Sequence, residues 1–231
     1  MYIYIWCAIN LFYLIIIDFH TSIVYNLMCE SGGTVNNIDK LREFIDNSST
    51  GIISSKEILE NNFSRATMNE LIRSGELTKY GRGFYIINNI FEDDFYIINQ
   101  RYSKGVFSHT SALFLLGYTL NTPIIYEMTF PKGYNTISLK NENVRIVRVI
   151  IENFDLGIEE ATSPNGNKVR CYNIERTLCD ILRGKGSEIS IINYAFIKYI
   201  NSKDKNIQLL LKYAEQLNVR DKVLKYLEVL L

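Results

Sequence analysis

Apolar residues between positions 51 and 88 recur first with a helical period and then with a strand period. Ser54 and Glu57 form a capping-box pattern, which predicts the start of one short helix. Ser64 is a candidate N-cap for a second helix, whose apolar positions follow at three- and four-residue spacing. Two short apolar runs and a glycine-bearing turn then predict a hairpin over residues 77–87. Helix, turn, helix and hairpin in this order predict a winged helix-turn-helix.

In that plan the amino end of the second helix enters the major groove of DNA, and the hairpin contacts the phosphate backbone. Hydroxyl, amide and guanidinium groups at these two places suit phosphates and base edges. They are Ser64, Arg65, Thr67 and Asn69 on the helix, with Lys79 and Arg82 at the hairpin. Residues 36–90 carry seven basic and seven acidic side chains, so a DNA-binding face requires segregated charge. A winged helix that contacts only protein is the alternative.

The first 34 residues form a separate apolar segment. Its uninterrupted part, residues 2–17, is 16 residues long, whereas a membrane span needs roughly 20. The chain contains no Lys or Arg before Lys40. Signal peptides normally begin with a basic region, and membrane-spanning helices are normally flanked by Lys or Arg. We therefore expect that residues 1–34 are not part of the working protein and that translation starts at Met28 or Val35. A membrane-surface helix is the alternative.

The remaining chain is expected to be an α+β protein of two domains. We predict a winged helix-turn-helix over residues 35–90, opened by a helix over 38–46, and a second domain over residues 91–231. The second domain is predicted to be mixed α/β, with a mostly antiparallel sheet and C-terminal helices. The strands are predicted at 105–107, 122–130, 144–150, 158–161 and 168–172, and the helices at 92–101, 108–117, 173–183, 188–200, 206–217 and 221–231.

The predicted strands and turns of the second domain carry six cations with few acids between them. These cations form a candidate basic patch for nucleic acid or for an acidic partner. Ordinary solvated strand faces explain the same pattern equally well. The six are Lys132, Lys140, Arg145, Arg148, Lys168 and Arg170.

The four cysteines and two histidines do not form a metal-binding pattern. We expect Cys171 and Cys179 to be buried free thiols in a reducing, cytoplasmic compartment, without a disulfide, metal or cofactor. His109 falls in the first turn of a predicted helix, where a local hydrogen bond is a sufficient explanation.

A catalytic motif is not recognisable in the sequence. Glu175 and Asp180 are five residues apart, roughly 140° round a helix, so they do not converge. Arg176 and Asp180 are spaced for a surface ion pair. The sequence contains no phosphate-binding loop, nucleophile elbow or metal motif, and we therefore expect no enzyme activity.

Taken together, these stretches resemble the AbiEi-type antitoxins of bacterial abortive-infection, type IV toxin–antitoxin systems. The resemblance covers about residues 36–231, and the combination of motifs in this order is more specific than the winged helix alone. Four stretches carry it: FSRATMNELIRSGELTKYGRGFY (63–85), VFSHTSALFLLGYT (106–119), TFPKGYN (129–135) and NGNKVRCYNIERTLCDILR (165–183).

The resemblance implies two roles. The winged helix would repress its own operon by binding inverted repeats in double-stranded promoter DNA, and Arg73 would join the DNA contacts. The C-terminal domain would counter a nucleotidyltransferase-like toxin without forming a stable complex. Two alternatives stay open: a stand-alone winged-helix regulator whose second domain senses a ligand or dimerises, and an enzyme with an unrecognised site around His109 and residues 175–180.

Overall fold

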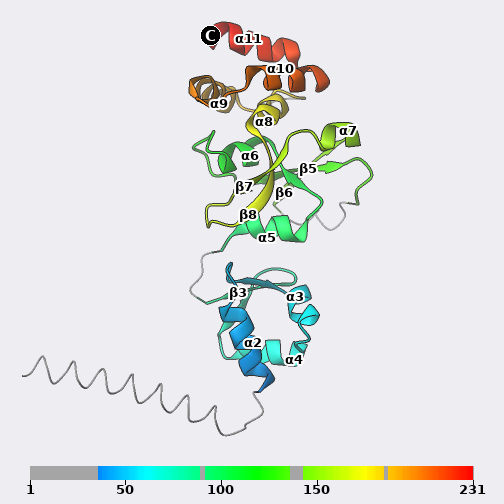
Figure 1. Cartoon of the computed structure of the whole chain (residues 1–231), viewed down its shortest axis with the longest axis vertical. Coiled ribbons are helices and arrows are strands. Elements are labelled where there is room, and N and C mark those ends of the chain that lie inside the picture. The colour runs from blue at the N-terminus through cyan, green and yellow to red at the C-terminus, as the bar shows by residue number, and fades with distance from the viewer. Residues whose placement is uncertain (1–35, 89–91, 136–142, 185–186, 231) are drawn as a thin grey trace, which may run out of the picture. The chain divides into compact units, whose positions relative to one another are not determined.

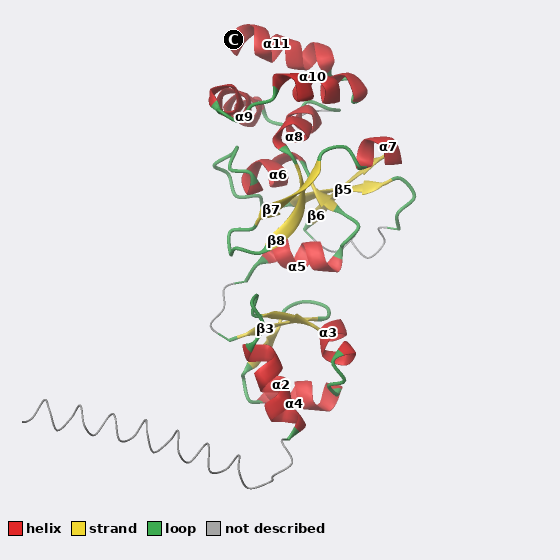
Figure 2. Ribbon diagram, viewed as in Figure 1, coloured by secondary structure: helices red, strands yellow, loops and turns green. Residues whose placement is uncertain are grey.

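The computed structural model describes residues 36–88, 92–135, 143–184 and 187–230. The expectations for residues 1–34 lie outside these described residues. The chain divides into two compact units, the first ending at Asn88 and the second beginning at Asn89 (Figure 1). The described residues form helices α2 to α11 and strands β1 to β8, so the predicted α+β class is confirmed (Figure 2).

The first unit combines three helices with a small antiparallel sheet. Its strands lie in the order β1-β3-β2, so the hairpin of β2 and β3 is joined by a strand from further up the chain. The short strand β1 was not predicted, because three residues show no period and its pairing with β3 is a long-range contact. The elements are α2 (Asn37–Asp46), β1 (Ile52–Ser54), α3 (Ser55–Glu60), α4 (Arg65–Arg73), β2 (Leu77–Lys79) and β3 (Phe84–Ile87).

A single apolar cluster holds the first unit together. Leu41 of α2, Ile58 of α3, Leu71 of α4 and Leu77 of β2 are almost completely buried in it. Each comes from the apolar face of its element, and burial of such a side chain contributes about 1.5–3 kcal/mol. The three helices therefore present their polar faces outward.

The second unit is built on a five-stranded sheet with the order β6-β5-β4-β8-β7. Within it, β4 pairs with β5 and β7 with β8 in antiparallel fashion, while β5–β6 and β4–β8 are parallel. Over both sheets the pairing is mostly antiparallel, whereas the sheet of the second unit, which was predicted to be mostly antiparallel, is mixed, with two antiparallel and two parallel pairings. The elements up to β8 are α5 (Asp94–Arg101), β4 (Val106–Phe107), α6 (His109–Leu115), β5 (Tyr126–Pro131), β6 (Val144–Val149), α7 (Ile151–Phe154), β7 (Ile158–Thr162) and β8 (Lys168–Tyr172).

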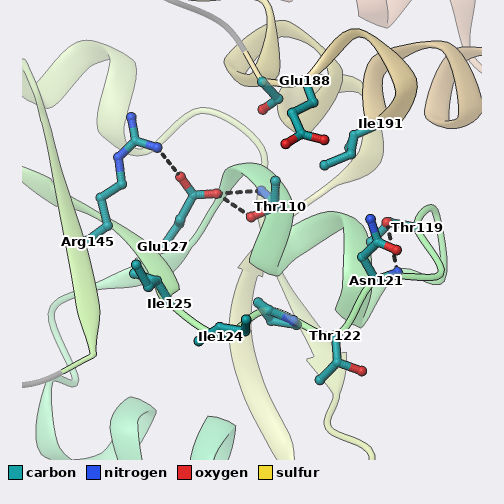
Figure 3. A pocket seen from close by; sticks show the side chains of 12 residues that line it. Thr110, Thr119, Asn121, Thr122, Ile124, Ile125, Glu127, Arg145, Glu188 and Ile191 are labelled. Carbon is teal, nitrogen blue, oxygen red and sulfur yellow. Dashed lines mark hydrogen bonds and ion pairs between the residues drawn. The ribbon is translucent and has the colours of Figure 1, made fainter.

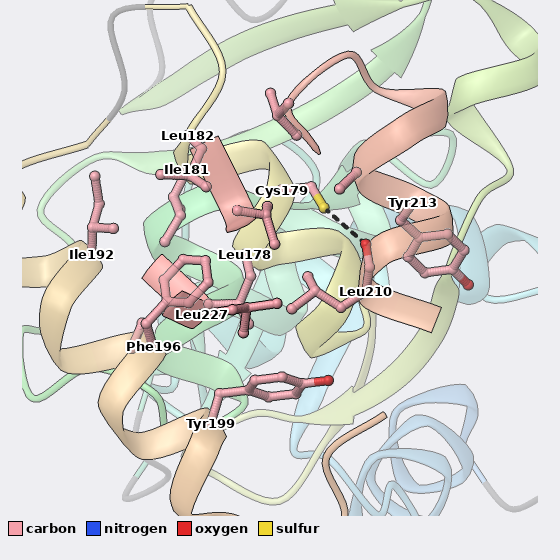
Figure 4. Packing of buried hydrophobic residues seen from close by; sticks show 14 of the residues in the cluster. Leu178, Cys179, Ile181, Leu182, Ile192, Phe196, Tyr199, Leu210, Tyr213 and Leu227 are labelled. Atoms are coloured by element: carbon pink, nitrogen blue, oxygen red, sulfur yellow. Dashed lines mark hydrogen bonds between the residues drawn. The ribbon is translucent and has the colours of Figure 1, made fainter. Parts of the chain in front are cut away.

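Four helices complete the second unit and bury the largest apolar cluster (Figure 4). Helix α8 packs against α6, α9 and α10, with Leu178, Phe196, Tyr199, Leu210 and Leu227 buried between the helices. In Figure 1, α5 lies at the opposite end of this unit from α9, α10 and α11. The four are α8 (Ile174–Ile181), α9 (Ile189–Asn201), α10 (Ile207–Gln216) and α11 (Arg220–Leu230).

Most predicted elements of the second unit are present, with boundaries shifted by one or two residues. The strand predicted over 122–130 is shorter than expected, because it begins only at Tyr126. Residues 122–125 have the β-branched composition of a strand but no described partner strand, and Ile124 is 86% exposed. Within the described parts of the chain, none of the helices is long and apolar enough to cross a bilayer.

Candidate nucleic-acid interface

Both helices of the predicted helix-turn-helix, α3 and α4, are capped at their amino ends by a serine side chain. The Ser54 hydroxyl oxygen accepts a hydrogen bond from the Glu57 amide at 3.1 Å, and the Glu57 carboxylate accepts one from the Ser54 amide at 2.7 Å. This confirms the predicted capping box. Between the helices, Asn62 adopts a left-handed conformation with φ of 62°, which asparagine tolerates better than most residues.

The amino end of α4 is capped as predicted. The Ser64 hydroxyl oxygen accepts a hydrogen bond from the Thr67 amide at 3.1 Å and lies 2.8 Å from the Thr67 hydroxyl. Met68 and Leu71 face the core, which leaves Arg65, Asn69, Glu70 and Arg73 exposed on the outer face of the helix. The two hydroxyls and Arg65 therefore lie together at the first turn of α4.

The hairpin places a cation at its tip. The Tyr80 amide donates to the Phe84 carbonyl at 2.9 Å, and Gly81 and Gly83 have φ values of 66° and 77°, which only glycine adopts readily. Arg82, exposed, lies between these glycines. The Gly83 carbonyl also accepts a hydrogen bond from the Ser55 amide at 2.7 Å, so the hairpin is fixed to the start of α3.

Two cations of the first unit, Arg42 and Lys56, are held in ion pairs. Arg42 binds both carboxylate oxygens of Glu76, at 2.8 and 2.9 Å, and Asp39 at 2.9 Å. Lys56 pairs with Glu60 at 3.6 Å. Within the described residues, the four cations of the predicted DNA contacts form no ion pair. These cations, called here the recognition cations, are Arg65, Arg73, Lys79 and Arg82.

The described members of the candidate basic patch fall into two groups, one at β6 and one on β8. Lys140 lies outside the described residues. Arg145 and Arg148 are on edge strand β6, and the Lys132 amide donates to the Val149 carbonyl at the end of that strand at 2.7 Å. Two strands, β5 and β4, separate this group from the other two members on β8. Those are Lys168 and Arg170, which donate to the Thr162 hydroxyl at 3.1 Å and to the Ser103 carbonyl at 2.7 Å.

A cavity of about 510 Å³ lies beside β5 and β6, and a buried carboxylate forms part of its wall (Figure 3). The Glu127 side chain is 6% exposed and accepts hydrogen bonds from Arg145 at 2.8 Å and from the Thr110 amide at 2.8 Å. Sequence reasoning did not single out Glu127. The sequence signal that could have identified Glu127 is its position as a single acid among the mainly apolar residues of β5, where burial of an unpaired carboxylate is costly.

The two residue groups of the enzyme alternative have mainly local roles. The His109 ring nitrogen Nδ1 lies 3.1 Å from the Ser108 hydroxyl, which confirms the expected local hydrogen bond. Glu175 accepts a hydrogen bond from the Tyr199 hydroxyl at 3.0 Å, whereas Asp180 pairs with Arg176 at 3.1 Å. The two carboxylates have different partners. Within the described residues, His, Cys, Asp and Glu do not gather into a group able to hold a metal ion.

The ion pair between Arg176 and Asp180 corrects one expectation. It was predicted on the surface, but the two side chains are 0% and 1% exposed. Arg176 also donates from Nη1 to the carbonyls of Asn153 and Leu156, and its guanidinium lies 4.3 Å from the centre of the Tyr172 ring. The pair is buried because α8 is enclosed on all sides: each side chain from Glu175 to Ile181 is buried.

Comparison with known proteins supports the fold but does not identify the chain. Neither a protein-family model nor a curated protein matches it. A solved structure, "Crystal structure of RV2827C protein from Mycobacterium tuberculosis", is similar with a TM-score of 0.55 and 13% sequence identity. The match covers 80% of this chain and 76% of that one. At this identity the likeness concerns the fold alone.

Proposed function

We propose that residues 36–88 are a winged helix-turn-helix that binds double-stranded DNA. The element order supports this reading, since two capped helices precede a hairpin and α2 packs against the second of them, α4. In this reading α4 is the recognition helix, with Ser64, Arg65 and Thr67 at its leading end. Lys79 and Arg82 of the hairpin then contact the phosphate backbone.

The observation that carries the proposal is the distribution of ion pairs. Asp39 and Glu76 are held by Arg42, Glu60 is paired with Lys56, and Glu57 belongs to the capping box. The recognition cations are left to bind phosphates or base edges, although residues 36–88 carry seven basic and seven acidic side chains. Glu70 is the acid on the exposed face of α4, and it weakens the local positive potential.

For the whole chain we propose the role of an AbiEi-type antitoxin. The first unit would repress the operon that encodes it, and the second would counter a nucleotidyltransferase-like toxin. This proposal rests on the four sequence stretches that resemble the family. The second candidate is a stand-alone winged-helix regulator, and the cavity beside Glu127 favours it because a ligand-sensing domain needs such a site.

Two experiments test this proposal. A gel-shift assay of the purified protein on the DNA upstream of its gene, with random DNA as competitor, should give a specific shift that weakens as salt is raised. If no specific shift is observed even at low salt, the DNA-binding role is contradicted.

The second experiment tests the antitoxin role. In cells whose growth is arrested by a nucleotidyltransferase-like toxin encoded beside this gene, co-expression of this protein should restore growth. Failure to rescue, together with a specific shift, would favour the stand-alone regulator.

A further inference from the structure

Helix α4 carries four exposed side chains on the face opposite its buried residues, Met68 and Leu71. At about 100° per residue, these four lie within an arc of about 100° centred opposite the buried pair. They extend over about 10 Å of helix, which equals the rise of about three base pairs of DNA. The face therefore has the length of a short major-groove contact. Its members, called here the outer strip, are Ala66, Asn69, Glu70 and Arg73.

The outer strip is short in its first two turns and long only at its carboxyl end. Ala66 has a single methyl group, and the Asn69 side chain, almost one turn later, is also short. Short side chains let a helix lie close to the base edges of the major groove, which is about 12 Å wide. Arg73 is in the last turn, from which its guanidinium can reach a phosphate. The Asn69 amide and the Glu70 carboxylate are therefore the polar groups at the depth of the bases.

The fold does not use the polar groups of Asn69 and Glu70. Among the residues that the structure describes, neither side chain forms a hydrogen bond or an ion pair. Asn61, just after α3, differs, because its side-chain amide donates to the Glu57 carbonyl at 2.9 Å. Asparagine is also less favourable than alanine inside a helix, so helix stability does not explain Asn69. Both groups are available to a ligand, and replacing either one should leave the fold intact.

Each of these two groups matches one base in the major groove. The asparagine amide donates and accepts, and adenine presents the complementary acceptor N7 and donor N6. A carboxylate only accepts, and cytosine presents the N4 amino donor. Guanine and thymine instead present acceptors, which repel a carboxylate.

A carboxylate that faces DNA is unfavourable unless it has a donor. The phosphates repel Glu70, and removing its charge from water against an acceptor edge leaves that charge unpaired. At a cytosine, the hydrogen bond from N4 offsets part of this cost. Glu70 would therefore act mainly by rejecting the other bases, which is how repulsive elements produce specificity.

We propose that the outer strip reads base sequence, with Asn69 on an adenine and Glu70 on a cytosine. Because the two residues are adjacent in the helix, the two bases lie within about two base pairs of each other. Arg73 contributes affinity at a phosphate. This inference rests on the proposed DNA binding, to which it adds the base preference.

Selection by the full-length protein from a pool of DNA duplexes with a randomised centre tests the proposal. Wild type should select sites with an adenine and a cytosine within about two base pairs of each other. Changing either base should weaken binding about tenfold in a gel-shift assay, a typical cost of one mismatched base pair. If no duplex is bound, both the proposed DNA binding and this inference are overturned. Binding without base preference would overturn this inference alone.

Two variants and a control assign the contacts. Asn69→Ala should lose only the adenine preference. Glu70→Gln should lose only the cytosine preference, and it should also bind random DNA more tightly because a repulsive charge is gone. Glu43→Gln removes an exposed acid of α2, outside the outer strip, and should keep both preferences.

The Glu70→Gln variant also separates base reading from simple repulsion. If Glu70 were only a solvated acid near the DNA, this variant would bind every sequence more tightly and keep the cytosine preference. That result would contradict the role of Glu70, and an unchanged adenine preference in Asn69→Ala would contradict the role of Asn69.

Discussion

Arg42 and Glu76 form a two-point ion pair that connects α2 with the segment between α4 and β2. Nε and Nη2 of Arg42 lie 2.8 and 2.9 Å from the two carboxylate oxygens. Two hydrogen bonds lower the pKa of the Glu76 carboxyl from 4.5 to about 2; the bond from Arg42 has the larger effect and the bond from Ser74 the smaller one. The contact fixes the position of α2 under the predicted DNA-binding helices while leaving the recognition cations unpaired.

The Arg42–Glu76 pair predicts an acid sensitivity of the fold. Because the pKa of Glu76 is lower in the folded state, the carboxylate stabilises the fold fully above about pH 4.5, and this contribution is lost as pH falls toward 2. The side chains are 42% and 40% exposed, so solvent limits its size. In urea unfolding followed over this pH range, the Glu76→Gln variant should lose less stability on acidification than wild type. Parallel curves would contradict this.

Substitutions of Ser64 should separate stability from DNA binding. Asp and Asn cap helices about as well as Ser, so Ser64→Asp and Ser64→Asn should both keep unfolding free energies within about 0.5 kcal/mol of wild type. Asp also places a negative charge where the proposal puts a phosphate. We therefore expect Ser64→Asp to lose operator affinity and Ser64→Asn, its matched control, to lose much less. Equal operator affinity of the two variants in fluorescence anisotropy would contradict a role for this helix end.

The buried pair of Arg176 and Asp180 should be costly to break. Arg176→Met leaves the Asp180 carboxylate with Arg183 as its remaining ion-pair partner, at 3.6 Å, and should lower the unfolding free energy by about 3–5 kcal/mol. The double variant Arg176→Met/Asp180→Leu removes both charges and should be more stable than the single variant. Chemical denaturation measures both. A single variant within 1 kcal/mol of wild type would show that the pair does not stabilise the fold.

The two described cysteines should be chemically inert in the folded protein. Burial raises the pKa of Cys179 to about 12 and that of Cys171 further still, so almost no thiolate forms at pH 8. In a Cys7→Ser/Cys29→Ser variant, a thiol reagent at pH 8 should react only after denaturant is added, and then with two thiols. Rapid reaction of the native variant would contradict the burial of these side chains.

The features that sequence analysis predicted best are local ones. The hydrogen bonds of the Ser54 and Ser64 caps join residues three apart, and the turn at Gly81 and Gly83 depends on the conformation of those residues alone. Such signals are complete within a few residues of chain. The helix boundaries and the hairpin of the first unit were therefore predicted almost to the residue.

The features that were missed depend on long-range packing. Arg176 and Asp180 have the spacing of a surface pair, but the pair is buried because α8 is enclosed by elements such as α6, α9 and α10. The carboxylate of Glu127 is paired by residues 17 and 18 positions away, on α6 and β6. The separation of the basic-patch residues between β6 and β8 follows from a strand order that periodicity does not reveal.

The most direct test of DNA binding compares an Arg65→Ala/Arg82→Ala variant with wild type on the promoter DNA, over a range of salt concentrations. Lys203→Ala/Lys212→Ala, which removes two exposed cations of the second unit, is the matched control. We expect the first variant to bind more weakly, by about 1–3 kcal/mol if Arg65 contacts a base, and with a shallower salt dependence. Equal affinity and equal salt dependence of all three proteins would contradict the assignment of α4 and the hairpin to DNA.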